Sequence, residues 1–411
     1  MKGLIKATLR PVWAPIRRRF EHIARVHQAP LLEEAATLRA RLGACERRLE
    51  EVISTHNHRL DGLVESEADL RKLLTELTDK VKAVAPNLFY EEQIARELAN
   101  FNEVTNVHDL PEIFHYWSNR YLLPMFRECG FGGIDEFYAS HFVKAARRVG
   151  GHARFVSVGA GNCDTEIRVA KLMMEMGLRD FELECLELNP VMLERGRDEA
   201  VSAGLERVLR FTQADFKAWR PSGSYAGVMA NHSLHHVTNL EGLFDGIKRA
   251  LDPRGYFVTS DMIGRNGHQR WPEALEHVQQ LWEELPQERR YNHLLRRSEP
   301  QFINWDCSGE GFEGIRAQDI LPLLLERFDF EVFVGFSNVV SPFVDRCFGH
   351  NFDAGSARDR AFIDRVHQID EEGFATGKLK PTQMLAVMTV GPAESHLYAR
   401  GLSPQTSVRT P

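Results

Sequence analysis

Two apolar runs in the middle of the chain each lead into residues that could bind a ligand. The run ARFVSV continues into Gly159, Ala160 and Gly161, and the run FELECLE ends on Glu187, with Leu188 after it. Glycines let a backbone turn sharply and approach a ligand closely, and an acid at the end of the next strand can accept both hydroxyls of a ribose. The spacing predicts a site for an adenosine-containing cofactor.

One residue in this turn discriminates between such cofactors. A dinucleotide fingerprint, GxGxxG, would need glycine where the chain has Asp164. A carboxylate at this position is unfavourable beside a pyrophosphate and tolerable beside an ammonium group. The turn therefore disfavours a dinucleotide.

Three further motifs follow in a fixed order. They are ADF at 214–216, NHSLHHV at 231–237 and RALDPRGYFV at 249–258. Together with VGAGN and LELNPVML, they make residues 137–390 resemble the class I methyltransferases that use S-adenosylmethionine. The resemblance implies a Rossmann-like, seven-stranded α/β sheet, and a methyl donor that has no pyrophosphate.

The resemblance also implies a role for each motif. The glycine turn faces the methionine moiety, the strand-two acid holds the ribose, and the strand-three acid meets the adenine amino group beside a packed phenylalanine. The residues expected to bind the cofactor are Gly159, Ala160, Gly161, Glu187, Leu188, Asp215, Phe216, Asn231 and His232. The chain departs from the family at Ser157, where an acid is usual, and at Cys163, where a third glycine is usual.

The catalytic candidates follow the fourth and fifth strands. Methyl transfer is an in-line displacement at a sulfonium methyl, so positioning supplies most of the rate and a base is needed only for a hydroxyl acceptor. His235, Asp261 and His268 are the candidates for that base. The alternative for His235, and for the neighbouring His236, is a structural histidine.

Acceptor-binding candidates cluster in DMIGRNGHQRWPEAL, residues 261–275, and in FHYWSNRY, residues 114–121. Polar donors beside a tryptophan suit a sugar, which stacks through one ring face and hydrogen-bonds through its hydroxyls. The alternatives are a loop fixed by its own polar groups and, for the second segment, an aromatic stripe in the core. The candidates are Tyr116, Arg120, Arg265, Asn266, Arg270 and Trp271.

The N-terminal region has two patterns of its own. From Leu31 to Val84 apolar residues recur in steps of four and three, interrupted only by His56 and Glu67, which favours a coiled coil and a homo-oligomer over a folded-back hairpin. The first thirty residues mix seven basic side chains with apolar ones and Trp13. Such a segment could contact an anionic membrane surface, or it could be a disordered tail.

These patterns divide the chain into segments. A long N-terminal coiled-coil helix and a helical cap precede the α/β sheet, and the insertions within the sheet domain are expected to be helical. The expected boundaries are a basic amphipathic segment at 1–30, a coiled coil at 31–85, a helical cap at 86–150, a methyltransferase domain at 151–392 with insertions at 265–325 and 341–380, and a disordered tail at 393–411.

Composition excludes several classes of protein. The net charge is -7 although the first thirty residues are basic, so the body of the chain is acidic and is not expected to bind nucleic acid. Six cysteines form no CxxC pair, which indicates a reducing compartment and no zinc site, and we expect no metal. Without a long apolar run or a signal-like segment, we expect a cytoplasmic protein, peripheral on the inner face of the membrane if the basic segment binds there.

The sequence leaves three functions open. The first is a methyltransferase that O-methylates a sugar of a bacterial surface glycan or its lipid-linked precursor, because the overall arrangement resembles bacterial enzymes of surface-polysaccharide synthesis. The second is a methyltransferase of a diffusible small molecule. The third is a non-catalytic coiled-coil scaffold with a degenerate cofactor domain.

Overall fold

The computed structural model describes residues 110–215, 219–221, 223–309 and 311–409, together with Thr37, Ala40 and Ala44, which are helical. The chain divides into two compact units, Met1–Glu92 and Gln93–Pro411. The expected segments at 1–30 and 31–85 lie outside the described residues, apart from those three, and so does the start of the helical cap. No helix among the described residues is long and apolar enough to cross a membrane.

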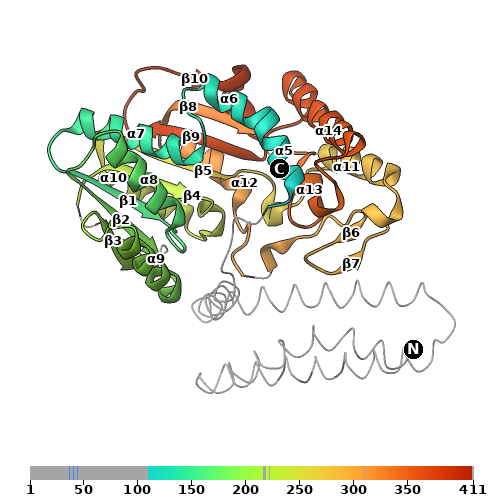
Figure 1. Cartoon of the computed structure of the whole chain (residues 1–411), viewed down its shortest axis with the longest axis horizontal. Coiled ribbons are helices and arrows are strands. Elements are labelled where there is room, and N and C mark those ends of the chain that lie inside the picture. Colours follow the sequence, from blue (N-terminus) through green and yellow to red (C-terminus); the bar gives the residue numbers. More distant parts are fainter. Residues whose placement is uncertain are drawn as a thin grey trace. The chain divides into compact units, whose positions relative to one another are not determined.

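An eight-stranded, mostly parallel sheet forms the centre of the second unit (Figure 1). Its strand order is β10-β8-β9-β5-β4-β1-β2-β3, and β9 alone runs antiparallel to its neighbours β5 and β8. The strands are β1 (Ala153–Val158), β2 (Phe181–Glu187), β3 (Leu209–Gln213), β4 (Tyr225–Asn231), β5 (Leu251–Met262), β8 (Asp329–Phe336), β9 (Gln383–Thr389) and β10 (Leu397–Tyr398). Seven of these form the expected α/β sheet, and β10 is an addition at one edge.

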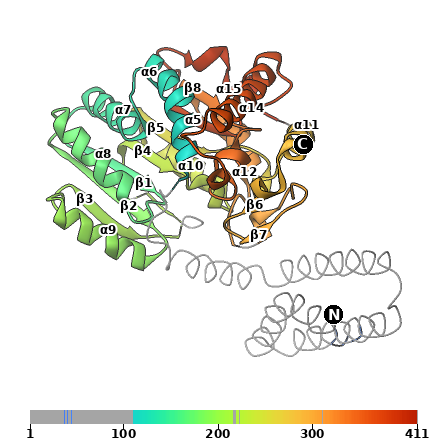
Figure 2. The same ribbon diagram turned by 45° about the vertical axis from the view of Figure 1, so that its right-hand side comes forward.

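Helices cover both faces of this sheet because its strands are apolar on both sides. Within β1, Phe155 belongs to the core beneath α7 (Ile134–Val149), α8 (Asp164–Glu175) and α9 (Pro190–Ser202). Val156 and Val158 belong to the opposite core, beneath α10 (Leu240–Ala250) and α12 (Ala317–Leu325). Figure 2 shows α8 and α9 beside β1, β2 and β3. The alternation along β1 therefore fixes which side chains approach which layer.

The described part of the helical cap is one helical path that changes its winding. It runs from α5 (Glu112–Trp117) through a π-helical turn, η1 (Ser118–Leu122), into α6 (Leu123–Glu128). Pro124 lacks the N–H that a regular α-helix would use, which accounts for the wider turn just before it. Residues 112–149 are helical apart from a turn at 129–133.

The two insertions are mainly, but not wholly, helical. The first holds α11 (Pro272–Glu284) and α12, and it also contains a short hairpin of β6 (Tyr291–Asn292) and β7 (Arg297–Ser298). The second holds α13 (Ser341–Val344) and α14 (Ala357–Thr376). Short 3-10 turns connect these elements at Gln287–Arg289, Cys307–Gly309 and Gly349–Asn351.

The expectation of a disordered tail from residue 393 is wrong for residues 393–409. β10 pairs in parallel with β8, and His396 Nδ1 lies 2.8 Å from the carbonyl oxygen of Phe330. A 3-10 turn (Ala399–Gly401) then leads to α15 (Pro404–Ser407), whose first turn is capped by the Ser403 hydroxyl. The segment is ordered because β10 forms hydrogen bonds with the open edge of β8. Its polar composition alone does not indicate this pairing.

Candidate active site

The turn after β1 has the backbone geometry that its glycines permit. Gly159 and Gly161 have φ angles of 74° and 54°, in the left-handed region that favours glycine. The N–H groups of Gly159 and Ala160 both donate to the carbonyl oxygen of Leu186, at 2.9 Å each. Cys163, which caps α8, also has a left-handed φ of 62°. The third position of the motif therefore keeps a glycine-like conformation although it carries a side chain.

Glu187 ties this turn to the start of the next helix. Its two carboxylate oxygens accept hydrogen bonds from the N–H groups of Gly161 and Asn189, both at 2.9 Å. Burial raises the pKa of the carboxyl, and the two N–H donors oppose that shift. A third backbone N–H, that of Leu188, also lowers this pKa. A carboxylate offers about four lone-pair directions, so the group can still accept a hydrogen bond from a ribose hydroxyl.

A buried acid lies beside Ser157. The Ser157 hydroxyl donates to Glu166 Oε1 at 2.7 Å, and Glu166 Oε2 has no hydrogen-bond partner within the described residues. Burial raises the pKa of Glu166 to about 7. Strand β1 lacks the acid that is usual in the family, and the first turn of α8 brings a carboxyl to the same place.

The remaining cofactor candidates lie at the carboxyl ends of the neighbouring strands. Leu188 and Asp215 follow β2 and β3 and are half-buried, and Phe216 lies outside the described residues. Asn231 ends β4, where Tyr138 donates to its side-chain oxygen at 3.3 Å. His232 follows with a left-handed φ of 50°, and burial lowers its pKa to about 4.

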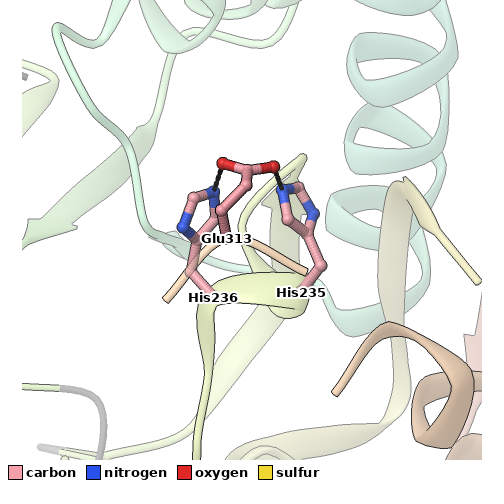
Figure 3. A group of neighbouring side chains, drawn as sticks. All are labelled: His235, His236 and Glu313. Carbon is pink, nitrogen blue, oxygen red and sulfur yellow. Dashed lines mark ion pairs between the residues drawn. The ribbon is translucent and has the colours of Figure 1, made fainter. Parts of the chain in front are cut away.

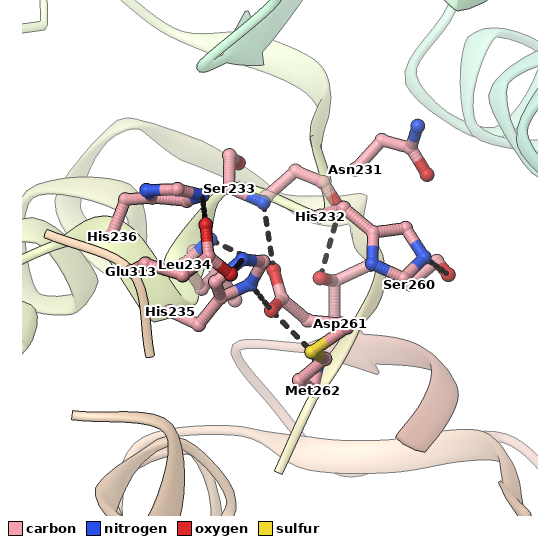
Figure 4. Close-up of polar contacts among 12 residues, drawn as sticks. Asn231, His232, Ser233, Leu234, His235, His236, Ser260, Asp261, Met262 and Glu313 are labelled. Atoms are coloured by element: carbon pink, nitrogen blue, oxygen red, sulfur yellow. Dashed lines mark hydrogen bonds and ion pairs between the residues drawn. The ribbon is translucent and has the colours of Figure 1, made fainter. Parts of the chain in front are cut away.

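His235 and Asp261 form a buried pair at the ends of β4 and β5. His235 Nδ1 lies 2.6 Å from Asp261 Oδ1, and Asp261 Oδ2 accepts the N–H groups of Ser233 and Leu234 at 2.9 and 2.8 Å (Figure 4). Burial lowers the pKa of His235, but the charge and hydrogen bond of Asp261 outweigh it, so the pKa lies above its ordinary value. The pair fixes the imidazole orientation.

Glu313 brings the other histidines to this pair. One of its oxygens lies 2.5 Å from His268 Nε2 and 3.4 Å from His235 Nε2, and the other lies 3.5 Å from His236 Nε2. Main-chain hydrogen bonds hold its loop in place, from Gly267 N–H to the Gly314 carbonyl and from Ile315 N–H to the His235 carbonyl. We call His235, His236, His268, Asp261 and Glu313 the histidine cluster.

The histidine cluster adjoins the glycine turn. The hydroxyl of Ser233, two residues before His235, donates to the carbonyl of Val158 at 2.6 Å, and Val158 directly precedes Gly159. The side chain of Asp261 is fully buried, while those of His268 and Glu313 are 23% and 37% exposed. The cluster is therefore buried at Asp261 and accessible at His268 and Glu313, and it lies next to the expected cofactor.

Most of the residues predicted to bind the acceptor instead contact other side chains or main-chain groups of the protein. Asn266 exchanges hydrogen bonds with Gln318, and Arg270 donates to the carbonyls of His268 and Asn338. The Trp271 ring is buried, and the guanidinium carbons of Arg265 and Arg409 lie 5.5 and 4.9 Å from its centre. Tyr116 and Arg120 both contact Asp364 of α14. Arg270 thus contacts the histidine cluster directly, through the main-chain carbonyl of His268.

Sequence reasoning missed two residues of this site. Glu313 lies in the segment 304–316, whose mixture of polar and aromatic residues is similar to that of 261–275, but no pattern in it singles out Glu313. Glu166 lies in the first turn of α8, where an acid is ordinary near a helix N-terminus. The sequence gave one indication of Glu166. Ser157 stands where an acid is usual, so the buried end of β1 has room for a carboxyl from α8.

A doubly wound sheet with a glycine turn after β1, an acid at the end of β2 and one antiparallel strand, β9, between β5 and β8 has the class I methyltransferase architecture. Residues 158–259 match the sequence profile of a family described as a methyltransferase domain. The sterol 24-C-methyltransferase of Neurospora crassa is 27% identical over 138 residues, which are 32% of this chain and 35% of that protein. The chain thus matches about a third of the length of this curated relative, and it contains an S-adenosylmethionine-dependent methyltransferase domain.

Two solved structures are also similar. Geranyl diphosphate C-methyltransferase from Streptomyces coelicolor A3(2) is 12% identical, with 62% of this chain and 75% of that chain covered and a TM-score of 0.37. The O-methyltransferase of a trans-AT polyketide synthase multienzyme from Brevibacillus brevis is 13% identical, with 74% and 84% covered and a TM-score of 0.37.

Proposed function

We propose that this protein transfers the methyl group of S-adenosylmethionine to a hydroxyl oxygen of a sugar in a bacterial surface glycan or its lipid-linked precursor. The observation that carries the hydroxyl acceptor is the meeting of His235, His268 and Glu313 beside the glycine turn. Transfer to oxygen requires that the hydroxyl lose its proton, and the Glu313 carboxylate in this group can accept a hydrogen bond from it.

The exposed part of the histidine cluster, His268 and Glu313, favours a polar acceptor. Glu313 and His268 are accessible, and an apolar molecule seated on them would remove water without replacing its hydrogen bonds. Each polar group left in that state costs about 1–3 kcal/mol. A hydroxyl-bearing acceptor avoids this cost.

The choice of a glycan rests on the N-terminal sequence and the polar surroundings of the site. Seven basic side chains among the first thirty residues could keep the enzyme near membrane-linked glycan. Trp271 is covered by Arg265 and Arg409, so the proposal does not rely on stacking against that ring. A diffusible small molecule is the alternative acceptor.

The test begins with calorimetry of the full-length protein and S-adenosylmethionine, for which we expect binding. The protein is then incubated with methyl-labelled cofactor and, separately, with lipid-linked glycan and soluble sugar-nucleotide fractions. Label in the glycan, together with loss of membrane association when residues 1–30 are deleted, supports the proposal. Label only in soluble molecules supports the alternative acceptor, and absence of cofactor binding refutes both.

A further inference from the structure

The spacing of atoms around Glu313 does not suit direct hydrogen bonds to two of its neighbours. Figure 3 shows its carboxylate between the rings of His235 and His236, with Nε2–oxygen separations of 3.4 and 3.5 Å. Hydrogen bonds between nitrogen and oxygen are commonly about 2.7–3.2 Å long. The three groups converge, yet they leave a gap between them.

A metal ion fits that gap. Two ligands that each lie about 2.1 Å from zinc at a tetrahedral angle are about 3.4 Å apart. The two measured separations, each to a different oxygen of the Glu313 carboxylate, have about this value, and the three residues offer ligand atoms that lie within 4.8 Å of one another. We propose that His235, His236 and Glu313 bind a divalent transition metal such as Zn²⁺ or Co²⁺.

Two of the three ligands, His235 and Glu313, already have the partners that metal ligands need. His235 Nδ1 is held by Asp261 at 2.6 Å, which turns Nε2 toward Glu313. Glu313 Oε1 is held by His268 Nε2 at 2.5 Å. A ligating histidine commonly donates a hydrogen bond from its second ring N–H to a carboxylate, and ligating carboxylates are themselves hydrogen-bonded. Asp261 and His268 are therefore positioning residues for the metal ligands.

The charges of the cluster agree with a divalent ion. Asp261 and Glu313 contribute two carboxylates, and Asp261 is fully buried. A single protonated imidazole balances one of these charges, whereas a divalent cation bound by neutral imidazoles balances both. Two nitrogens and one oxygen favour zinc, cobalt, nickel or iron over magnesium and calcium, which prefer oxygen ligands.

The ligand set also leaves room for the acceptor. Three protein ligands leave at least one coordination position free, as in catalytic metal sites. Glu313 is 37% exposed and His236 is 20% exposed, so an acceptor oxygen can reach that position. A metal there would stabilise the ionised hydroxyl. This catalytic role rests on the proposed function, but metal binding does not.

The test uses full-length protein without a polyhistidine tag, stripped with a chelator and titrated with Co²⁺ while its visible absorption is recorded. We expect a spectrum of low-coordinate cobalt that Zn²⁺ abolishes. His236→Ala and Glu313→Gln should each weaken Co²⁺ binding by about 10-fold or more. The matched control is His152→Ala, which removes another histidine 2.6 Å from a carboxylate, that of Asp180, on the surface.

The outcomes separate the metal from the function. The inference is overturned if the parent gives no such spectrum, or if both cluster variants bind Co²⁺ as tightly as the parent while still binding S-adenosylmethionine. Metal binding without methyl transfer to any glycan fraction leaves the site standing and counts against the proposed function. If methyl transfer proceeds at the same rate with and without the metal, the metal has no catalytic role.

Discussion

The unfolding free energy of the Glu166→Gln variant, measured relative to that of the parent, should increase as the pH rises. Glu166 is 2% exposed, and burial raises its pKa from 4.5 to about 7. The folded state therefore holds this proton more tightly than the unfolded state. By linkage, the parent loses stability as the pH rises from about 4.5 through 7.

The pKa difference sets the size of the effect. A shift of one unit corresponds to about 1.4 kcal/mol, so the full effect is about 3 kcal/mol, of which about 2.5 kcal/mol develops between pH 5 and pH 8. Glutamine has no such proton and can still accept from the Ser157 hydroxyl. The unfolding free energy of Glu166→Gln minus that of the parent should grow by this amount over that interval.

Urea unfolding of both proteins, followed by tryptophan fluorescence from pH 5 to pH 8, measures this difference. All other titrating groups are common to the two proteins and cancel to first order. Glu175→Gln, at an exposed position on the same helix, is the matched control and should show a flat difference. A difference for Glu166→Gln that is equally flat would refute the reasoning that burial dominates the titration of this carboxyl.

Two further predictions concern the cofactor and the buried pair. Glu187→Gln should weaken S-adenosylmethionine binding in calorimetry by about 10–100-fold, because hydrogen bonds to a charged group contribute about 1.5–3 kcal/mol; Glu184→Gln on the same strand should leave it unchanged. Asp261→Asn should lower the unfolding free energy by about 3–5 kcal/mol, as expected when one partner of a buried ion pair is removed. A loss below about 1 kcal/mol in urea unfolding would show that His235 does not depend on this charge.

The cofactor half of the site could be predicted because its signals are local. Gly159, Gly161 and Glu187 lie in two consecutive strand ends, and adjacent parallel strands must bring such ends together. In the structure the N–H of Gly161 donates a hydrogen bond to Glu187. The sequence also offered His235, after β4, as a candidate base, with a structural histidine as the alternative.

The acceptor half could be predicted only in part. His268 follows β5, and its link to His235 depends on Glu313, which comes from an insertion that no periodic pattern connects to the sheet. Trp271 was expected to offer a stacking face, and Arg409 approaches it instead. Arg409 belongs to the tail whose order comes from pairing with β8. Contacts of this kind depend on tertiary packing and leave no local trace in composition.

The two halves are coupled by the sheet itself. β1 and β4 are neighbours and run in parallel, with Ser157 opposite Met229, so the turn after Val158 and the histidines after Asn231 emerge side by side. The Ser233 hydroxyl joins them through the Val158 carbonyl. Movement of the glycine turn on cofactor binding would therefore act on the backbone that carries His235 and His236. Because Asp261 binds that same backbone, the fold resists such movement and keeps the histidine cluster in register with the expected cofactor.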